Sequence, residues 1–244
     1  MAALRFLVDF DNVERGISRA GPASLARILV SRVPSQVLAK HEHSVVRLYG
    51  GWREKGQATR AAQDLIPKIS RESPLYIGVM HPGVSLKVRV NIEMADRPIG
   101  ASSQLPATMV RDRSLRSFRA LPQPWLNCTD EATCGLSSMS NIRHTTSCSK
   151  KGCRNTISDI LVRDEQKMVD TLIVADLAHN VFSERATHVV VVSSDSDMWP
   201  GILLALRAGC QVLHFPGVRG QRTDPGLRGT LDVHMQKRYI EMSL

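Results

Sequence analysis

The sequence predicts an α/β protein: a three-layer α/β/α sandwich built on a central parallel sheet, in one domain spanning residues 1–244 with residues 82–155 inserted as a small subdomain. Strand-like apolar segments alternate with helix-like segments in the first third of the chain and again after about residue 160. Between them, a stretch rich in Ser, Pro and Arg breaks the alternation and holds four of the five cysteines. Helices that alternate with wholly apolar strands are typical of parallel sheets covered on both faces.

The first third of the chain is expected to form three strands and two helices. Apolar residues recur at helical spacing in ASLARILVSRV, which stops at Pro34. A second helix follows later, and Pro67 is expected to end it early. The expected helices cover residues 23–33 and 59–69, and the expected strands cover residues 4–10, 45–49 and 75–79.

The alternation resumes towards the C-terminus. A long apolar-striped helix is expected over residues 164–182, with Asp164 as its N-cap. The β-branched segment THVVVVS then predicts a buried strand, and a further helix ends at Gly209. A last strand is expected over residues 210–215, and the final 25 or so residues are expected to form a loop with a short terminal element.

Composition and charge narrow the classes of protein. The hydrophobic fraction of 43% is ordinary for a soluble protein, and the chain has no uninterrupted apolar run of about 18 residues that would span a membrane. Asp9 and Asp11 interrupt the apolar N-terminal run, which argues against a secretory leader, so we expect a cytoplasmic protein without a membrane partner.

The formal net charge of +9 indicates a polyanionic partner, and nucleic acid is the expected one. The basic residues are clustered, which strengthens this expectation. The densest group is Arg111, Arg113, Arg116 and Arg119, which we expect to contact the phosphate backbone.

Pairs of aspartates follow two of the expected strands. Asp9 and Asp11 stand at the end of the first strand, where period-two geometry predicts that both point to one face. Asp195 and Asp197 follow the strand THVVVVS. Because sites in open α/β sheets form at the carboxyl ends of the strands, two acidic pairs there predict one shared site. The alternative is that these acids only cap the helices that follow, as Asp195 would do for the helix near residue 198.

The helix QKMVDTLIVADLAHN supplies a further acid. Lys167 and Asp170 lie one turn apart and share a face. Asp176 is about 240° further around the helix, so it cannot point the same way as Asp170. We therefore interpret Asp170 as a member of the site and Asp176 as a supporting or structural residue.

Clustered carboxylates repel one another, and a divalent cation removes this repulsion. Hard oxygen ligands select Mg²⁺ or Mn²⁺, which also accept phosphate oxygens. The expected chemistry is hydrolysis of a phosphodiester without a covalent enzyme intermediate.

The cysteines of the insertion suggest a second metal. Their spacing is C-x5-C-x13-C-x4-C in a segment too polar to form a core, and a zinc ion can fold such a segment. Disulfides or free thiols are the alternatives, and His144 could replace one cysteine. The expected structural Zn²⁺ ligands are Cys128, Cys134, Cys148 and Cys153.

Three segments resemble the signature segments of NYN domains, which belong to the PIN-like nucleases: LVDFDN, KMVDTLIVADLAH and VVVVSSDSDMWPGILLALRAGCQV. The resemblance covers roughly residues 4–80 and 160–215. It implies a PIN-like fold with a 3-2-1-4-5 parallel sheet and metal-dependent endoribonuclease activity. The acidic metal site that it implies is Asp9, Asp170, Asp195 and Asp197, with Asn12, Lys167, Ser193 and Ser194 around it.

Two other functions are compatible with the residues. One is a PIN-like module that binds RNA or a protein partner, or forms a homo-oligomer, without cutting. The other is a haloacid dehalogenase-type phosphatase, in which Asp9 would be the nucleophile. The sequence departs from both families in part: Ser194 and Ser196 stand where NYN domains usually have a Gly, and Trp199 stands where the phosphatases have a further acid.

Overall fold

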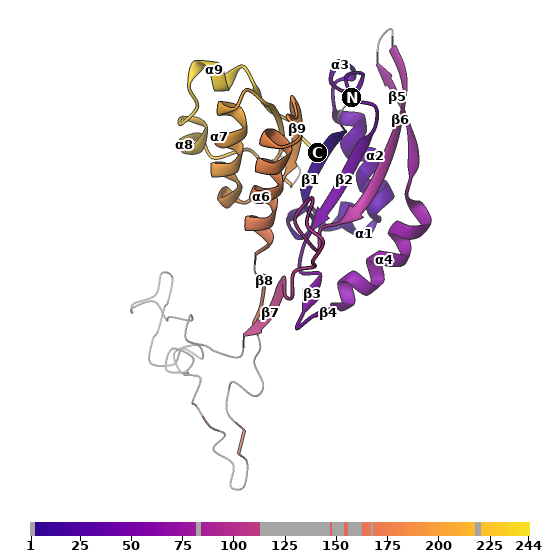
Figure 1. Ribbon diagram of the computed structural model, residues 1–244, viewed down its shortest axis with the longest axis vertical. Helices are drawn as coiled ribbons and strands as arrows, with labels where there is room; N and C mark the ends of the chain where they lie inside the picture. The colour runs from indigo at the N-terminus through magenta and orange to yellow at the C-terminus, as the bar shows by residue number, and fades with distance from the viewer. Residues whose placement is uncertain are drawn as a thin grey trace, which may run out of the picture. The chain divides into compact units, whose positions relative to one another are not determined.

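A computed structural model gives the structure of the chain (Figure 1) and describes residues 3–81, 84–112, 147, 154–155, 163–166, 168–217 and 221–244. The chain divides into two compact units. One comprises Met1–Met109 and Gln166–Leu244, and the other comprises Val110–Glu165. The first unit contains the main sheet and the helices that cover it.

The main sheet has seven strands in the order β11-β10-β9-β1-β2-β6-β5. Neighbouring strands are parallel except for the pair β5 and β6. When β1, β2, β6, β9 and β10 are numbered along the chain, their spatial order is 3-2-1-4-5. The strands are β1 (Leu4–Asp9), β2 (Ser44–Tyr49), β5 (Leu75–His81), β6 (Val84–Met94), β9 (His188–Val192), β10 (Gln211–Phe215) and β11 (Tyr239–Glu241).

Helices cover both faces of this sheet (Figure 1). The helices α2 (Pro22–Arg32) and α4 (Arg60–Glu72) share one apolar core with Phe6 and Val8 of β1. The helices α6 (Val169–Phe182) and α7 (Trp199–Arg207) share the other core with Leu7. Because successive residues of β1 enter opposite cores, Phe6, Leu7 and Val8 are all apolar. The first unit is therefore an α/β layer structure, compatible with a three-layer sandwich.

The remaining elements are short. Two two-stranded sheets pair β3 with β4 and β7 with β8. These strands are β3 (Arg53–Glu54), β4 (Gln57–Ala58), β7 (Met109–Asp112) and β8 (Arg163–Gln166). The short helices are η1 (Phe10–Asn12), α1 (Arg15–Arg19), α3 (Ser35–Leu38), η4 (Ser196–Met198), α8 (Pro225–Arg228) and α9 (Val233–Gln236).

The start of the insertion differs from the prediction at residue 82. β6 takes the third parallel position beside β2, and the expected third strand, β5, is an antiparallel edge strand paired with β6. The alternating stretch SLKVRV is thus part of the main sheet, and the second compact unit begins at Val110. The sequence did not predict that β6 belongs to the main sheet, because its alternation of polar and apolar residues is also typical of an isolated edge strand.

Two helix boundaries also differ from the predictions. The helix α6 begins at Val169 instead of Asp164, because residues 163–166 pair with β7 as β8. Met168 precedes the helix with φ of 63°, a left-handed conformation that turns the chain sharply. Pro67 does not end α4, which continues to Glu72. Pro67 and Gln63 are exposed, so water can bond the carbonyl group that Pro67 leaves without an amide donor.

The C-terminal region ends in a short element, as the sequence predicts, and that element is a strand. Its terminal strand β11 pairs in parallel with β10 and extends the sheet. No helix among the described residues is both long and apolar enough to cross a membrane.

Candidate metal centre

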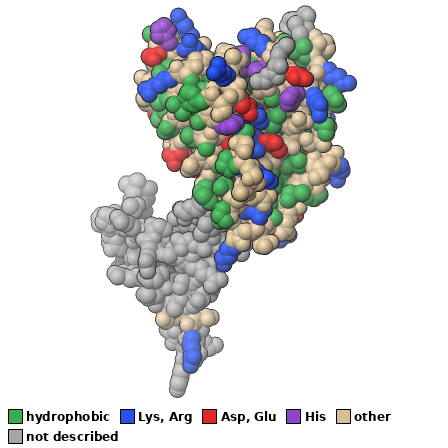
Figure 2. All heavy atoms as spheres, in the orientation of Figure 1, with side chains coloured by type: hydrophobic (Ala, Val, Ile, Leu, Met, Phe, Trp, Pro, Cys, Tyr) green, Lys and Arg blue, Asp and Glu red, His purple; other side chains and the backbone are tan. Residues whose placement is uncertain are grey.

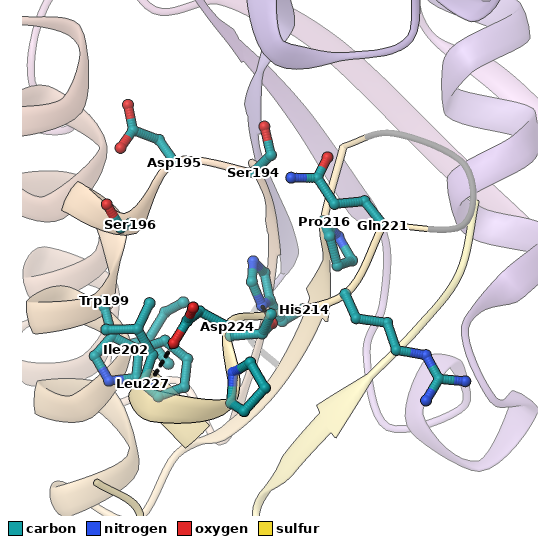
Figure 3. Close-up of a pocket in the computed structure, with 13 residues that line it drawn as sticks. Ser194, Asp195, Ser196, Trp199, Ile202, His214, Pro216, Gln221, Asp224 and Leu227 are labelled. Carbon is teal, nitrogen blue, oxygen red and sulfur yellow. Dashed lines mark hydrogen bonds between the residues drawn. The ribbon is translucent and has the colours of Figure 1, made fainter. Parts of the chain in front are cut away.

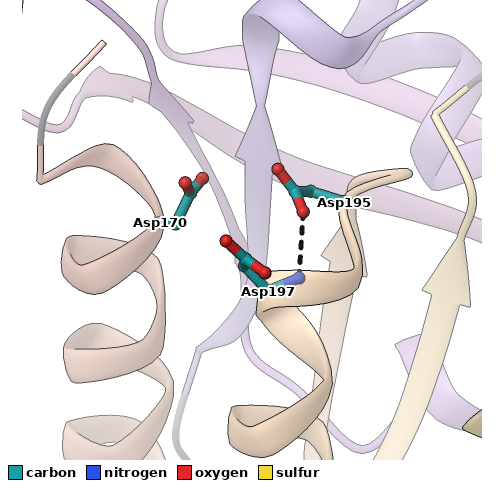
Figure 4. Close-up of side chains that lie close together, drawn as sticks. All are labelled: Asp170, Asp195 and Asp197. Atoms are coloured by element: carbon teal, nitrogen blue, oxygen red, sulfur yellow. Dashed lines mark hydrogen bonds between the residues drawn. The ribbon is translucent and has the colours of Figure 1, made fainter. Parts of the chain in front are cut away.

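Three aspartates meet at the carboxyl end of the main sheet (Figure 4). Asp170 lies in the first turn of α6, whereas Asp195 and Asp197 lie between β9 and α7, at and within η4. One carboxylate oxygen of each lies within 4.8 Å of the others. Asp170 and Asp195 are half-buried and Asp197 is exposed. The structure therefore brings together three of the four acids that the sequence assigned to the site.

The predicted alternative of helix capping also applies to Asp195. Its Oδ1 accepts the backbone N–H of Asp197 at 2.9 Å, so Asp195 caps η4. Its own N–H donates to the Ser193 hydroxyl at 3.0 Å. Capping fixes the direction of the carboxylate and uses only one of its two oxygens, so it is compatible with a ligand role.

Asp9, the fourth predicted acid, ends β1 and is only 1% exposed. Its Oδ2 accepts hydrogen bonds from Asn12 Nδ2 at 2.5 Å and from the Ser193 hydroxyl at 3.0 Å. Its Oδ1 is buried and has no hydrogen-bond partner among the residues that the structure describes. A buried carboxylate oxygen without a donor is costly, and a cation is one of the groups that can satisfy it.

The pKa values reflect the same concentration of charge. The pKa of Asp9 is raised from 3.8 to about 6, chiefly by burial; the hydrogen bonds from Asn12 and Ser193 oppose this shift, and the charges of Asp170 and Asp11 add to it. Burial, followed by the charges of Asp195 and Asp197, raises the pKa of Asp170. The field at this end of the sheet thus favours a proton or a cation. The donors are hard carboxylate oxygens, so the residues present fit Mg²⁺ or Mn²⁺.

Asp11 does not join the three clustered acids. The strand ends at Asp9 and the chain turns into η1, so the period-two geometry behind the predicted shared face does not extend to Asp11. The Asp11 Oδ2 instead accepts the Gly51 N–H at 3.4 Å and a hydrogen bond from the Gln166 amide. Asp11 connects η1 to the β2–β3 turn and to the end of β8.

Asp176 is buried inside the first unit and has a structural role, one of the two roles that the sequence allowed. Its Oδ2 accepts from Arg47 Nε at 2.9 Å and from the Tyr49 hydroxyl at 2.7 Å, and its Oδ1 accepts the Ile99 N–H at 2.7 Å. The ion pair with Arg47 ties α6 to β2. No sequence pattern indicated this role for Arg47, which lies within a strand whose six residues are all buried.

Some of the other predicted residues lie at the site, and the rest lie mostly outside the residues that the structure describes. Asn12 and Ser193 contact Asp9, and Ser194 follows on the same loop. Arg111 belongs to β7. Outside the described residues lie Lys167, Arg113, Arg116, Arg119, Cys128, Cys134, Cys148 and Cys153. On the face seen in Figure 2, the Lys and Arg side chains of the described residues are spread over the surface and do not gather in one patch.

A pocket beside the acids was not predicted. It has a volume of 380 Å³, and Ser194 and Asp195 belong to its wall together with residues of α7 and of the loop after β10. Gly217 begins this loop with φ of 64°, and a Cβ there would lie 2.6 Å from the Asn12 carbonyl oxygen. The Pro-Gly pair after the apolar strand was the only sequence signal for this close approach.

A search of protein families, curated proteins and solved structures finds no match to this chain. The candidate site is therefore defined by the geometry of this chain alone.

Proposed function

We propose that this chain is a metal-dependent nuclease that hydrolyses phosphodiester bonds, with RNA as the substrate. Two observations carry the proposal: Asp170, Asp195 and Asp197 converge, and the charge of Asp170 acts on the buried Asp9, whose Oδ1 has no hydrogen-bond donor among the described residues. A cap or a surface acid does not need this arrangement. A divalent cation site does, because it concentrates negative oxygens against their mutual repulsion.

Each residue has a distinct part in the proposal. Asp170, Asp195 and Asp197 would hold Mg²⁺ or Mn²⁺, and Asp9 would add negative charge close to Asp170. Asn12 and Ser193 orient the Asp9 carboxylate through its Oδ2. When bound, the ion supplies a Lewis acid that activates water and stabilises the charge developing on the phosphodiester.

Two features support RNA cleavage by a PIN-like domain. The segments that carry the three clustered acids are among those that resemble NYN domains. The first five of the six parallel strands along the chain have the 3-2-1-4-5 order that this resemblance implies, and β11 adds a sixth beside β10. The burial of Asp9 argues against the phosphatase alternative, because a nucleophile has to reach its substrate and this side chain is 1% exposed.

The test is incubation of the purified protein with end-labelled single-stranded RNA and DNA in Mn²⁺, Mg²⁺ or EDTA. We expect RNA cleavage with either metal, none in EDTA, and loss of cleavage by orders of magnitude in Asp170→Asn. Asp64→Asn, which makes the same charge change on the exposed side of α4, is the matched control and should cut normally. Binding without cleavage would instead support the non-catalytic module, and equal cleavage by both variants would exclude these acids as the active site.

We further propose that the arginine group, Arg111, Arg113, Arg116 and Arg119, contacts the phosphate backbone of the substrate. We also propose that the four cysteines of the insertion, Cys128, Cys134, Cys148 and Cys153, hold a structural zinc ion. Elemental analysis should then find about one zinc per chain, which Cys128→Ser releases. Four titratable thiols without zinc, or two disulfides, would contradict the zinc proposal.

A further inference from the structure

A 380 Å³ pocket lies beside the acidic cluster (Figure 3). Ser194 and Asp195 stand at its upper edge in this view, so the pocket and the acidic cluster share a wall. Its volume falls within the range of about 300–1,000 Å³ that is typical of small-molecule sites. An extended substrate could therefore place one group in the pocket and the adjacent group at the acids.

The lining of the pocket combines apolar surface with a few polar groups. Trp199, Ile202 and Leu227 supply the apolar part, and the Asp224 carboxylate lies among them in Figure 3. Gln221 and Arg222 supply hydrogen-bond donors from the loop after β10. A nucleobase has the complementary character, because its faces are apolar and its edge carries donors and acceptors.

The walls of the pocket are held in place by hydrogen bonds. The Trp199 indole N–H donates to Thr230 Oγ1 at 3.0 Å. The buried His214 lies 2.9 Å from the Ser193 carbonyl oxygen through Nε2 and 2.7 Å from the Tyr239 hydroxyl through Nδ1. Ser193 in turn donates to Asp9. The pocket is thus pre-formed and shares a hydrogen-bond network with the acidic site, which favours ligand binding without rearrangement.

We propose that this pocket binds the base of a nucleotide adjacent to the scissile phosphate, and that the substrate is therefore single-stranded nucleic acid. A base within a duplex is stacked and paired, so it enters a side pocket only after leaving the helix. Single strands and loops present such bases at little cost. This inference rests on the proposed nuclease function for the position of the phosphate, but the pocket itself can be tested without cleavage.

The first experiment measures binding in EDTA. The chain has three tryptophans, so the ¹⁵N-labelled protein gives three indole N–H signals, and triple-resonance spectra assign the one from Trp199. Titration with the four ribonucleoside 5′-monophosphates should shift this signal in a saturable way, whereas ribose 5-phosphate, which lacks the base, should not. No shift, or an equal shift with ribose 5-phosphate, would overturn the proposal.

Variants then locate the binding site. Replacing both Gln221 and Arg222 with Ala should weaken nucleotide binding by roughly tenfold or more, since hydrogen bonds to a charged group are among the stronger ones. Both residues are exposed, so the fold should be unaffected. Arg238→Ala removes one positive charge from an exposed position that does not line the pocket, and it should bind as the wild type does. Equal weakening by both variants would mean that only net charge attracts the nucleotide, which contradicts a base pocket.

The second experiment connects the pocket to the reaction. With Mn²⁺, an RNA of mapped cleavage site should be cut faster as a single strand than in a duplex, and more slowly when an abasic residue flanks the cleaved bond on the side that the pocket binds. Nucleotide binding without any cleavage would overturn the nuclease function and leave the pocket assignment standing. Cleavage that ignores both strandedness and the flanking base would overturn the pocket assignment and leave the nuclease function standing.

Discussion

Asp9 and Asp176 are equally buried, at 1% and 0% exposure, but their surroundings are opposite. Asp176 contacts a cation and two further donors: Arg47, the Tyr49 hydroxyl and the Ile99 N–H. Asp9 has two neutral donors on one oxygen, no donor among the described residues on the other, and acids as its charged neighbours.

The difference separates an acid that stabilises the fold from one that the fold accommodates at a cost. A fully paired buried carboxylate is destabilising to remove, because its partners lose their bonds. A partly paired carboxylate among like charges is destabilising to keep while it is ionised and no cation is bound. Neutralising Asp176 should therefore destabilise the fold, whereas neutralising Asp9 should stabilise the metal-free fold.

The largest effect is expected from Asp176→Asn. It leaves the Arg47 guanidinium, whose side chain is 7% exposed, without its buried counter-charge. We expect a loss of about 3–5 kcal/mol in the free energy of unfolding, typical of removing one partner from a buried ion pair. Urea denaturation in EDTA measures it. A midpoint equal to that of the wild type would show that Glu93, which also contacts Arg47, compensates fully.

Asp9→Asn should have the opposite sign in EDTA. Because the pKa of Asp9 is raised from 3.8 to about 6 in the folded protein, its contribution favours folding below pH 4 and is lost as the pH rises through 6. The shift of roughly two units corresponds to about 3 kcal/mol, which the variant should regain at pH 8 and not at pH 3.5. Denaturation at the two pH values tests this. Destabilisation at pH 8 would mean that Asp9 is held ionised by its hydrogen bonds.

Metal addition should reveal the function of the clustered acids. A ligand at 100 times its Kd stabilises the folded state by about 2.7 kcal/mol, and Mn²⁺ should raise the Tm of the wild type accordingly. Asp197→Asn should lose most of this increase, because Asp197 is an exposed member of the cluster. Asp64→Asn should retain it. An undiminished Mn²⁺ effect in Asp197→Asn would remove Asp197 from the site.

The smallest effect concerns His188, at the amino end of β9, opposite the acids. The pKa of His188 is lowered to about 4, chiefly by burial; the charges of His41 and Lys40 add to this shift, and a hydrogen bond with Gln211 opposes it. A lowered pKa gives stability that is present above pH 6.5 and lost as the pH falls towards 4.

His188→Gln should therefore lose less stability than the wild type between pH 7 and pH 5, by about 2 kcal/mol at most. Parallel unfolding curves at the two pH values measure this difference. Identical pH dependence of the two proteins would show that His188 does not titrate differently on folding.

Elements with strong periodicity could be predicted from the sequence, and those that depend on distant partners could not. The strands β1, β2, β9 and β10 lie within two residues of their predicted bounds because uninterrupted apolar runs need cover on both faces. β6 was predicted to belong to the insertion because polar and apolar residues alternate along it, as in an isolated edge strand. The start of α6 was predicted too early because β8 forms only by pairing with β7, a partner distant in the sequence.

The candidate site shows the same limit. Asp170, Asp195 and Asp197 could be placed together because each follows a strand or starts a helix at one edge of the sheet. The position of Asp11 in η1 depended on where the strand stopped, which period-two reasoning cannot determine. The pocket residues from Gln221 to Leu227 had no sequence signal, because their position depends on how a polar loop crosses the end of β10.

The helix α6 carries both kinds of aspartate, and this gives the buried ion pair a further consequence. Asp170 and Asp176 are six residues apart, and a helix rises about 1.5 Å per residue. A slip of α6 by one residue would move Asp170 by more than the tolerance of about 0.2 Å that metal–ligand distances allow. The ion pair between Arg47 and Asp176 opposes such a slip of α6 against β2. Arg47 thus helps to hold Asp170, the proposed metal ligand, in place from about 9 Å along the helix axis, and substitution of Arg47 should lower metal affinity although Arg47 does not contact the proposed site.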